Sequence, residues 1–398
     1  MIFTKLSYKA APLLMIGAIA VATPAAAEEK SNTGKFYGDF RLRYESVSQD
    51  NPLEDADALT LRSRVGYKTA KYEGFSAVIE VENSTSIIDD FSVPPSGVRT
   101  GEFSVIADPE GTELDQAFVQ YSNDALTAKI GRQVITLDGH RFVGHVGWRQ
   151  DRQTFDAALL TYKPTKDFVI NATYIDKRNR IFSDDADLDS KDTILNTSYD
   201  TSAGKLVGYA YLLEVDNGSD NSIDTYGVSF SGAQKAGDSK LLYTLEYATQ
   251  DSNDAFDTDY IFVEGGATFG GVTAKLGYEV LGSDDGQAGF ATPLATLHKF
   301  NGWSDQFLGT PSQGLKDLYV SLAGKLAGGK WVAAYHDFSS DVSLDGADDL
   351  GDELNLLYSR KFGDNFSGGI KFAKYSAGDS GFGKVDTDKV WLWAGASF

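Results

Sequence analysis

The sequence contains no cysteine, only nine prolines and only four histidines among its 398 residues. The absence of cysteine excludes disulfides as supports of the fold, although it permits an oxidising compartment. After residue 27 no apolar run is long enough for a membrane-spanning helix, which excludes a helical membrane protein. The histidines have no spacing typical of a metal-binding helix, so we expect neither a metal nor a cofactor; they are His140, His145, His298 and His336.

Positive charge is also scarce, since 36 Lys and Arg face 57 Asp and Glu, for a formal net charge of -21. No nucleic-acid partner is expected. Many acids gather in two predicted outer loops, where they would form a negative rim. The first group is Asp184, Asp185, Asp187, Asp189 and Asp192, and the second is Asp341, Asp345, Asp348, Asp349, Asp352 and Glu353.

The amino-terminal segment has the pattern of an export signal. Lys5 and Lys9 give a positive start, 13–22 is apolar, and three alanines at 25–27 form a small-residue cleavage site. We therefore expect residues 1–27 to be removed. Residues 28–398 would then form one domain outside the inner membrane.

The rest of the chain is rich in glycine, phenylalanine and tyrosine, and it alternates with period two. In the first segment, Phe36, Phe40 and Leu42 alternate with Arg41 and Arg43. Runs of about ten such residues, ended by turn residues, are typical of a transmembrane antiparallel β-barrel, with apolar side chains facing lipid and charged side chains facing a wet lumen. We count roughly eighteen strands, about twenty residues for each strand with its share of loop.

Connections alternate between short and long, as expected for periplasmic turns and extracellular loops. Long connections are predicted at 84–112, 178–191, 282–314 and 340–351. The last segment, 390–398, alternates and ends in Phe398, which resembles the terminal strand read by outer-membrane assembly machinery. Trp391 and Trp393 have the opposite parity, so they form either an aromatic patch in the lumen or part of an interfacial girdle.

The segment 131–157 is a basic island in an acidic chain. Arg132, Arg141, Arg149 and Arg152 stand among glycines that break any helix or strand. This composition predicts a loop that folds back on the barrel. Its guanidinium groups either remain free to bind carboxylates or phosphates, or pair with the acids beside them.

Strand parity places further charges in the predicted lumen. Because rings of Arg or Lys favour anions, these residues are candidates for the pore lining together with the four arginines of the island. Two acids on the neighbouring strand are expected to face them. The additional candidates are Arg41, Arg43, Arg62, Arg64 and Lys129, with the acids Glu80 and Glu82.

The motifs KIGRQ, RFVG, GWRQ and RQTFDA, together with the long segment 290–320, resemble the alginate-export family of outer-membrane β-barrels. The resemblance extends through nearly all of the mature chain. It implies an eighteen-stranded barrel in the outer membrane of a Gram-negative bacterium. It also implies an arginine-lined lumen, carried by Arg132, Arg141, Arg149 and Arg152 and by the arginines of the first two strands.

Two local sequence patterns are each compatible with a ligand-binding role and with a purely structural one. Residues 341–352 carry Asp and Gly at offsets of a calcium-binding loop, but without flanking helices an acidic solvated loop is favoured. Trp303, Asp305 and Phe307 either stack against a sugar or anchor a folded loop, and the anchor is favoured.

No nucleophile and base are placed for catalysis, so the sequence does not predict an enzyme. It predicts a porin-like channel for passive diffusion of small hydrophilic solutes, including anions or oligosaccharides. The alternative is a dedicated export channel for an acidic polysaccharide such as alginate. Outer-membrane lipid, lipopolysaccharide and the barrel-assembly machinery are the expected partners.

Overall fold

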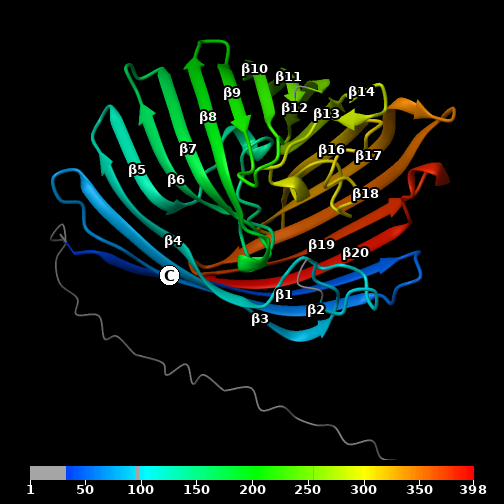
Figure 1. Ribbon diagram of the computed structural model, residues 1–398, viewed down its shortest axis with the longest axis horizontal. Helices are drawn as coiled ribbons and strands as arrows, with labels where there is room; N and C mark the ends of the chain where they lie inside the picture. Colours follow the sequence, from blue (N-terminus) through cyan, green and yellow to red (C-terminus); the bar gives the residue numbers. More distant parts are fainter. Residues whose placement is uncertain (1–32, 95–97, 254) are drawn as a thin grey trace, which may run out of the picture. The chain divides into compact units, whose positions relative to one another are not determined.

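The computed structural model describes residues 33–94, 98–253 and 255–398. The expected export signal at 1–27 lies outside these residues. Gly34–Phe398 forms one compact unit, an antiparallel β-barrel (Figure 1). Its first nine strands are β1 (Lys35–Gln49), β2 (Ala56–Lys68), β3 (Phe75–Asp90), β4 (Gly111–Ser122), β5 (Leu126–Gln133), β6 (Thr154–Tyr162), β7 (Phe168–Asn179), β8 (Leu188–Asp200) and β9 (Lys205–Leu213).

The second nine strands continue around the ring and close it. They are β10 (Ile223–Ala236), β11 (Ser239–Ser252), β12 (Phe256–Phe269), β13 (Val272–Leu281), β16 (Leu315–Leu326), β17 (Gly329–Leu344), β18 (Ala347–Phe362), β19 (Phe366–Ser376) and β20 (Thr387–Ser397). Closure follows because β1 pairs with both β2 and β20. The eighteen-stranded sheet confirms the predicted fold class and strand count.

Structure outside the barrel sheet is limited in the described residues. The strands β14 (Ser283–Asp284) and β15 (Ala288–Gly289) form a small hairpin. Four 3-10 turns complete the elements: η1 (Asp138–His140), η2 (Ser183–Ala186), η3 (Leu297–Lys299) and η4 (Ser380–Phe382). No helix in the described part of the chain is long and apolar enough to cross a membrane.

The two ends of the barrel differ as predicted, with one exception. Tight turns such as 270–271 and 327–328 lie at one end, and the long connections 91–110, 134–153 and 282–314 lie at the other. The predicted long loop at 340–351 is wrong, because β17 and β18 continue to a two-residue turn at Asp345 and Gly346. Both turn residues have positive φ (52° and 88°), as a tight hairpin requires. The calcium-loop pattern is therefore a hairpin.

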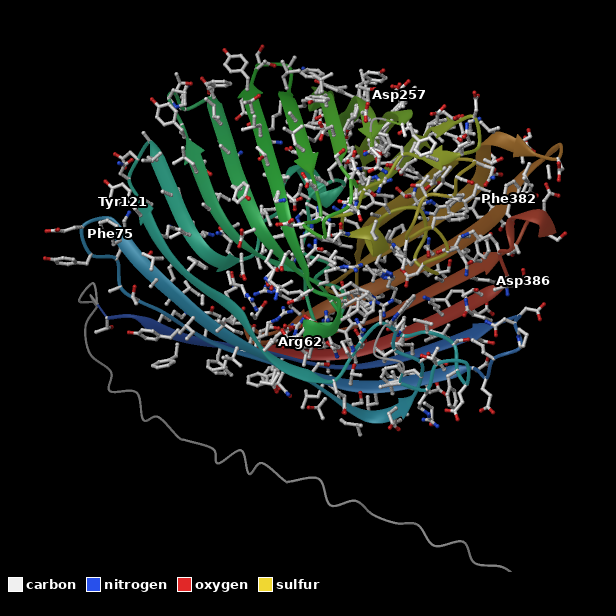
Figure 2. The ribbon with its side chains drawn as sticks, viewed as in Figure 1. Arg62, Phe75, Tyr121, Asp257, Phe382 and Asp386 are labelled. Carbon is white, nitrogen blue, oxygen red and sulfur yellow. The ribbon has the colours of Figure 1, made fainter. Side chains whose placement is uncertain are left out.

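The outward surface carries the apolar half of the alternation. Leu42 is exposed, whereas Arg43, the next residue, is fully buried inside the ring. Exposed aromatic side chains mark the end with short turns, including Phe36, Phe75 and Phe269, and Figure 2 shows Phe75 and Tyr121 projecting at this end. Such a girdle is typical of a membrane interface. The predicted assignment of the two faces in β1 is confirmed.

The interior is not an open tube, because two connections fold into it. These are the β5–β6 loop (134–153) and the β13–β16 connection (282–314), whose chain lies within the ring of strands in Figure 1. From the first, Phe142 packs its ring against Tyr209 at 5.2 Å, Tyr260 at 5.3 Å and Phe290 at 6.0 Å. An apolar cluster thus seats both connections against β9 and β12.

Candidate functional site

The candidate site is the charged constriction that these two connections form inside the barrel. The β5–β6 loop reaches the wall made by β1 and β2. There Arg41 donates hydrogen bonds to the carbonyl oxygens of Trp148 (2.8 Å) and Arg149 (2.6 Å), and Gln150 donates to the hydroxyl of Thr60 (2.7 Å). Carbonyls of a buried loop need donors, and the strand side chains provide them.

Arg149 joins three separate parts of the chain. Its guanidinium binds both carboxylate oxygens of Glu45 on β1, at 3.0 and 3.1 Å, and Asp305 of the β13–β16 connection at 2.8 Å. All three side chains are nearly fully buried. Burial lowers the pKa of Arg149, but Glu45 and Asp305 outweigh it and the pKa is raised, so Arg149 stays charged.

Arg152 and Arg64 hold the end of the β5–β6 loop against β3 and β4. Arg152 donates to Asp115 at 2.6 and 3.1 Å and also contacts Glu80. Arg64 pairs with Glu82, and its Nε lies 3.6 Å from Asp115. The two acids of β3 thus contact the arginines directly.

The remaining predicted arginines are paired in the same way. Arg141 donates to Glu279 on β13 at 2.7 Å, across the lumen from its own loop. Arg43 pairs with Asp108, and Arg62 pairs with Asp39. The interpretation that arginines pair with acids is thus supported, but most of the acids come from distant strands rather than from sequence neighbours.

Arg132 does not face the lumen. It follows Ile130 by two residues on β5, and Ile130 is 65% exposed on the outward face. The register therefore places Arg132 outward at the rim, where it binds both oxygens of Asp156 at 2.8 and 3.0 Å. Its expected place in the pore lining is corrected on this ground. Lys129 has the opposite parity and lies over the ring of Phe118 at 4.4 Å.

Sequence reasoning did not assign His298 and Lys371 to the site. Lys371 on β19 donates to Nε2 of His298 at 2.6 Å, so that nitrogen must accept, and Nδ1–H then donates to Asp305 at 2.6 Å. Burial, reinforced by the charge of Lys371, lowers the pKa of His298 to about 3 against the opposing effect of Asp305. A neutral imidazole therefore connects an ammonium group to a carboxylate.

Tryptophans surround the ammonium group of Lys371. Its Nζ lies 4.4 Å from the ring centroid of Trp148 and 4.0 Å from that of Trp303, and Trp391 is fully buried beside them. Cations over indole faces are attracted by the ring quadrupole. Of the two alternatives for Trp391, the structure shows the lumen patch. Its parity in β20 was the signal in the sequence.

The segment 303–307 is an anchor, as favoured from the sequence. Phe307 is buried, with its ring centroid 4.6 Å from that of Phe338. The backbone N–H of Ser304 donates to Glu353 at 2.9 Å, and Trp303 donates to the same carboxylate. The β13–β16 connection is therefore held to β17 and β18.

Charge is unevenly distributed around the lumen. A mainly basic wall runs through β19, β20, β1 and β2, and acidic side chains lie on β11, β12, β13, β16 and β18, the last of which pairs with β19. In Figure 2, Arg62 of the basic wall lies between Phe75 at one end and Asp386 at the other. The basic side chains are Arg41, Arg43, Arg62, Arg64, Lys371 and Lys389, and the acidic ones are Glu246, Glu264, Glu279, Asp317 and Glu353.

A cavity of about 320 Å³ lies next to this constriction. Its lining includes Arg149, His298, Asp305 and Leu308 of the two connections, with Phe182 supplied by the β7–β8 connection. The cavity lies among the long connections, so it belongs to the end of the barrel that carries them.

The matching family model is described as alginate export and covers residues 33–280. Acinetobacter baumannii OccAB4 has the same fold, with a TM-score of 0.71 at 14% identity, covering 92% of this chain and 98% of that chain. Pseudomonas aeruginosa OccK9 (OpdG) matches with a TM-score of 0.72 at 14% identity, over 92% and 98%. Pseudomonas aeruginosa OpdO matches with a TM-score of 0.69 at 12% identity, over 92% and 97%. No curated protein sequence matches the chain.

The similarity to these solved structures is one of fold, given the low identities. With the family match it identifies a porin-like barrel of the outer membrane, so the predicted class of channel and its location are confirmed. The family model covers well over half of the residues, and the whole barrel has the expected architecture. The chain belongs to the alginate-export family.

Proposed function

We propose that the barrel passes small hydrophilic solutes, including small anions and short oligosaccharides, by passive diffusion through a lumen that the β5–β6 loop narrows. The observation that carries this proposal is the fixed position of the loop. Ion pairs join it to β1 through Arg149, to β4 through Arg152 and to β13 through Arg141. A loop tied to three walls narrows the lumen, which favours small solutes over polymers.

The pairing of the arginines also bears on the choice of solute. A conduit for a polyanion needs a row of cations that are free to exchange partners, but Arg141, Arg149 and Arg152 already hold buried acids. Among the described residues, Arg41 and Lys371 have no carboxylate within ion-pair distance. These two are the basic side chains that we expect to favour small anions at the basic wall.

Single-channel recording in planar bilayers under a KCl gradient tests this proposal. We expect stepwise conductance and a reversal potential that shows preference for chloride. Arg41→Gln should reduce that preference, whereas Lys235→Gln, at the far end of β10, should leave it unchanged. Absence of conductance by the refolded wild type would refute the proposed channel function. A reversal potential that shows preference for potassium would refute the proposed anion selectivity.

The alternative is a dedicated exporter of an acidic polysaccharide, and the family match favours it. Liposomes that contain both the protein and trapped alginate distinguish the two. Release of short oligomers alone supports diffusion of small solutes. Release of the polymer at a comparable rate supports export.

Two further proposals concern the two ends of the chain. We propose that β20 is the strand recognised by the barrel-assembly machinery, because its outward alternation ends in Phe398, which is 64% exposed. Deletion of Phe398 should lower the amount of assembled barrel in the outer membrane. We further propose that residues 1–27 are removed during export, which sequencing of the mature amino terminus tests. Fold and family are those of channels, and we propose no catalytic role.

A further inference from the structure

Three carboxylates converge at one point beside the β5–β6 loop. They belong to Glu82 on β3, Glu113 on β4 and Asp151 on the loop, and one carboxylate oxygen from each lies within 4.8 Å of the other two. Glu82 and Glu113 are directly opposite each other in the β3–β4 register. Like charges opposite one another on paired strands are destabilising, and the third carboxylate adds to the repulsion.

The neighbouring cations do not neutralise this group. The connected set of contacts holds five carboxylates, since Glu80 and Asp115 join the three, and two guanidinium groups, those of Arg64 and Arg152. The charges of Arg62 and Arg132 act on Glu82 and Glu113 from beyond ion-pair distance. Glu82 uses one oxygen to bind Arg64. Negative charge therefore remains in excess where the side chains are buried.

Unpartnered oxygens point to a ligand at this place. Oε1 of Glu82 and Oδ1 of Asp151 are buried and have no hydrogen-bond donor among the residues that the structure describes. The two side chains belong to residues that are only 2% and 3% exposed. The other oxygen of Asp151 accepts from the backbone N–H of Ser183 at 2.9 Å, which fixes the orientation of the carboxylate.

A single proton does not satisfy this arrangement. Three ionised carboxylates at this separation repel one another, so three anions do not coexist there without compensation. One proton bridges one pair of oxygens and leaves the third oxygen without a partner. A divalent cation contacts all three at once, and carboxylate oxygens are the ligands that hard cations prefer.

We propose that Glu82, Glu113 and Asp151 bind one divalent cation of the size of calcium. The three ligands come from separate backbone segments, and calcium accepts the irregular geometry that such a set provides, whereas magnesium demands a near-ideal octahedron. Glu113 is partly exposed and provides the entry path for the ion. Ser84, on the same inward face of β3, has a buried hydroxyl without a partner in the described residues and is a candidate for a further ligand.

The site would fasten the β5–β6 loop to the barrel wall. Asp151 is adjacent to Arg152, whose ion pairs hold the same end of the loop, and Ser183 brings in the connection between β7 and β8. Cation binding thus adds a clamp at the constriction. The binding itself is independent of the proposed function, and only an effect on conductance rests on it.

Calorimetric titration of the chelator-treated protein with CaCl2, after refolding without lipopolysaccharide, tests the site. We expect one Ca²⁺ per barrel, weaker binding of Mg²⁺, and a higher melting temperature with Ca²⁺. Asp151→Asn keeps the shape and the bond from Ser183 but should weaken Ca²⁺ binding about tenfold or more. Glu113→Gln, at a partly exposed position, is the second variant.

Asp345→Asn is the matched control, because it removes a carboxylate from the hairpin at 345–346 that mimics a calcium loop in sequence. It should bind Ca²⁺ as the wild type does. Equal affinity of the wild type, Asp151→Asn and Glu113→Gln would overturn the proposal and indicate adventitious binding to acidic surface. The proposal would also be overturned if the wild type showed no saturable Ca²⁺ binding and Asp151→Asn had a higher melting temperature. That result would mean that the three carboxyl groups share protons and bind no cation.

Conductance measurements in planar bilayers distinguish the proposed cation site from the proposed channel function. If Ca²⁺ binds as expected, chelation should increase current fluctuations of the wild type and leave those of Asp151→Asn unchanged. A protein that binds Ca²⁺ but does not conduct would refute the proposed function and keep the cation site.

Discussion

Replacement of Arg149 by methionine should destabilise the barrel interior strongly. The substitution keeps a long side chain in place but removes the cation that joins Glu45 to Asp305. Both acids are almost completely buried, so water does not replace the lost guanidinium. The β5–β6 loop would also lose its tie to β1.

The size of the expected destabilisation follows from the ion pairs that Glu45 and Asp305 keep in the variant. Removal of one partner from a buried ion pair costs about 3 to 5 kcal/mol. Asp305 still has Lys389 at 2.9 Å, and Glu45 still has Arg43 at 3.2 Å. We therefore expect the lower end of the range, about 3 kcal/mol in the free energy of unfolding.

Equilibrium unfolding in urea, followed by tryptophan fluorescence of the refolded barrel, measures this loss. Trp148 is adjacent to Arg149, so its emission also reports on the loop. Arg99→Met is the matched control, because Arg99 pairs with Asp90 and Glu102 at the surface and its loss should leave the midpoint unchanged.

A double variant sharpens the test. Adding Glu45→Gln to Arg149→Met removes the uncompensated buried charge and should recover part of the lost stability. If Arg149→Met unfolds at the same urea concentration as Arg99→Met, the buried ion pairs do not hold the loop and the reasoning fails.

Two further predictions concern pH and the membrane-facing surface. In the folded protein the pKa of His298, about 3, is below its ordinary value, so the fold favours the neutral imidazole. This contribution to the free energy of unfolding is complete above pH about 6.5 and is lost as the pH falls, by about 2 kcal/mol at pH 5. His298→Gln should flatten the pH dependence of unfolding between pH 7 and pH 5, and an unchanged slope would contradict a buried neutral imidazole. Leu245→Arg, on the exposed face of β11, should cost about 2 to 4 kcal/mol in lipid, whereas Thr244→Arg on the inward face should cost much less. Equal losses in urea titrations of the two variants would mean that the faces are exchanged.

The strands were predictable because their signal is local. Alternation in 36–45 assigns Leu42 to lipid and Arg43 to the lumen without reference to any other strand, since arginine is costly in the bilayer. Where acids replace the apolar residues, as at 341–353, the same rule predicted a loop. There the structure has the ends of β17 and β18, which extend beyond the membrane and need no apolar face.

The site was only half predictable. The basic island was recognised as a loop that folds back, but the partner of Arg141 is Glu279 and the partners of Arg149 are Glu45 and Asp305. No local pattern connects residues so far apart in the chain. The parity of Arg132 was misjudged because the island was treated as one segment, although Arg132 still belongs to β5.

The sequence by itself determined the class of protein: an exported, acidic chain whose period-two alternation and aromatic residues require a barrel that lipid surrounds. Only the tertiary structure decided which charges remain free. Ring closure brings β1 beside β20 and lets one loop touch opposite walls, so that Arg149 pairs with two carboxylates, whereas among the described residues no carboxylate lies within ion-pair distance of Arg41 or Lys371. The physical reason is that the alternation within a strand depends only on which of its two faces meets lipid and which meets the lumen. The pairing of buried charges depends instead on which strands the closed barrel places across the lumen from one another.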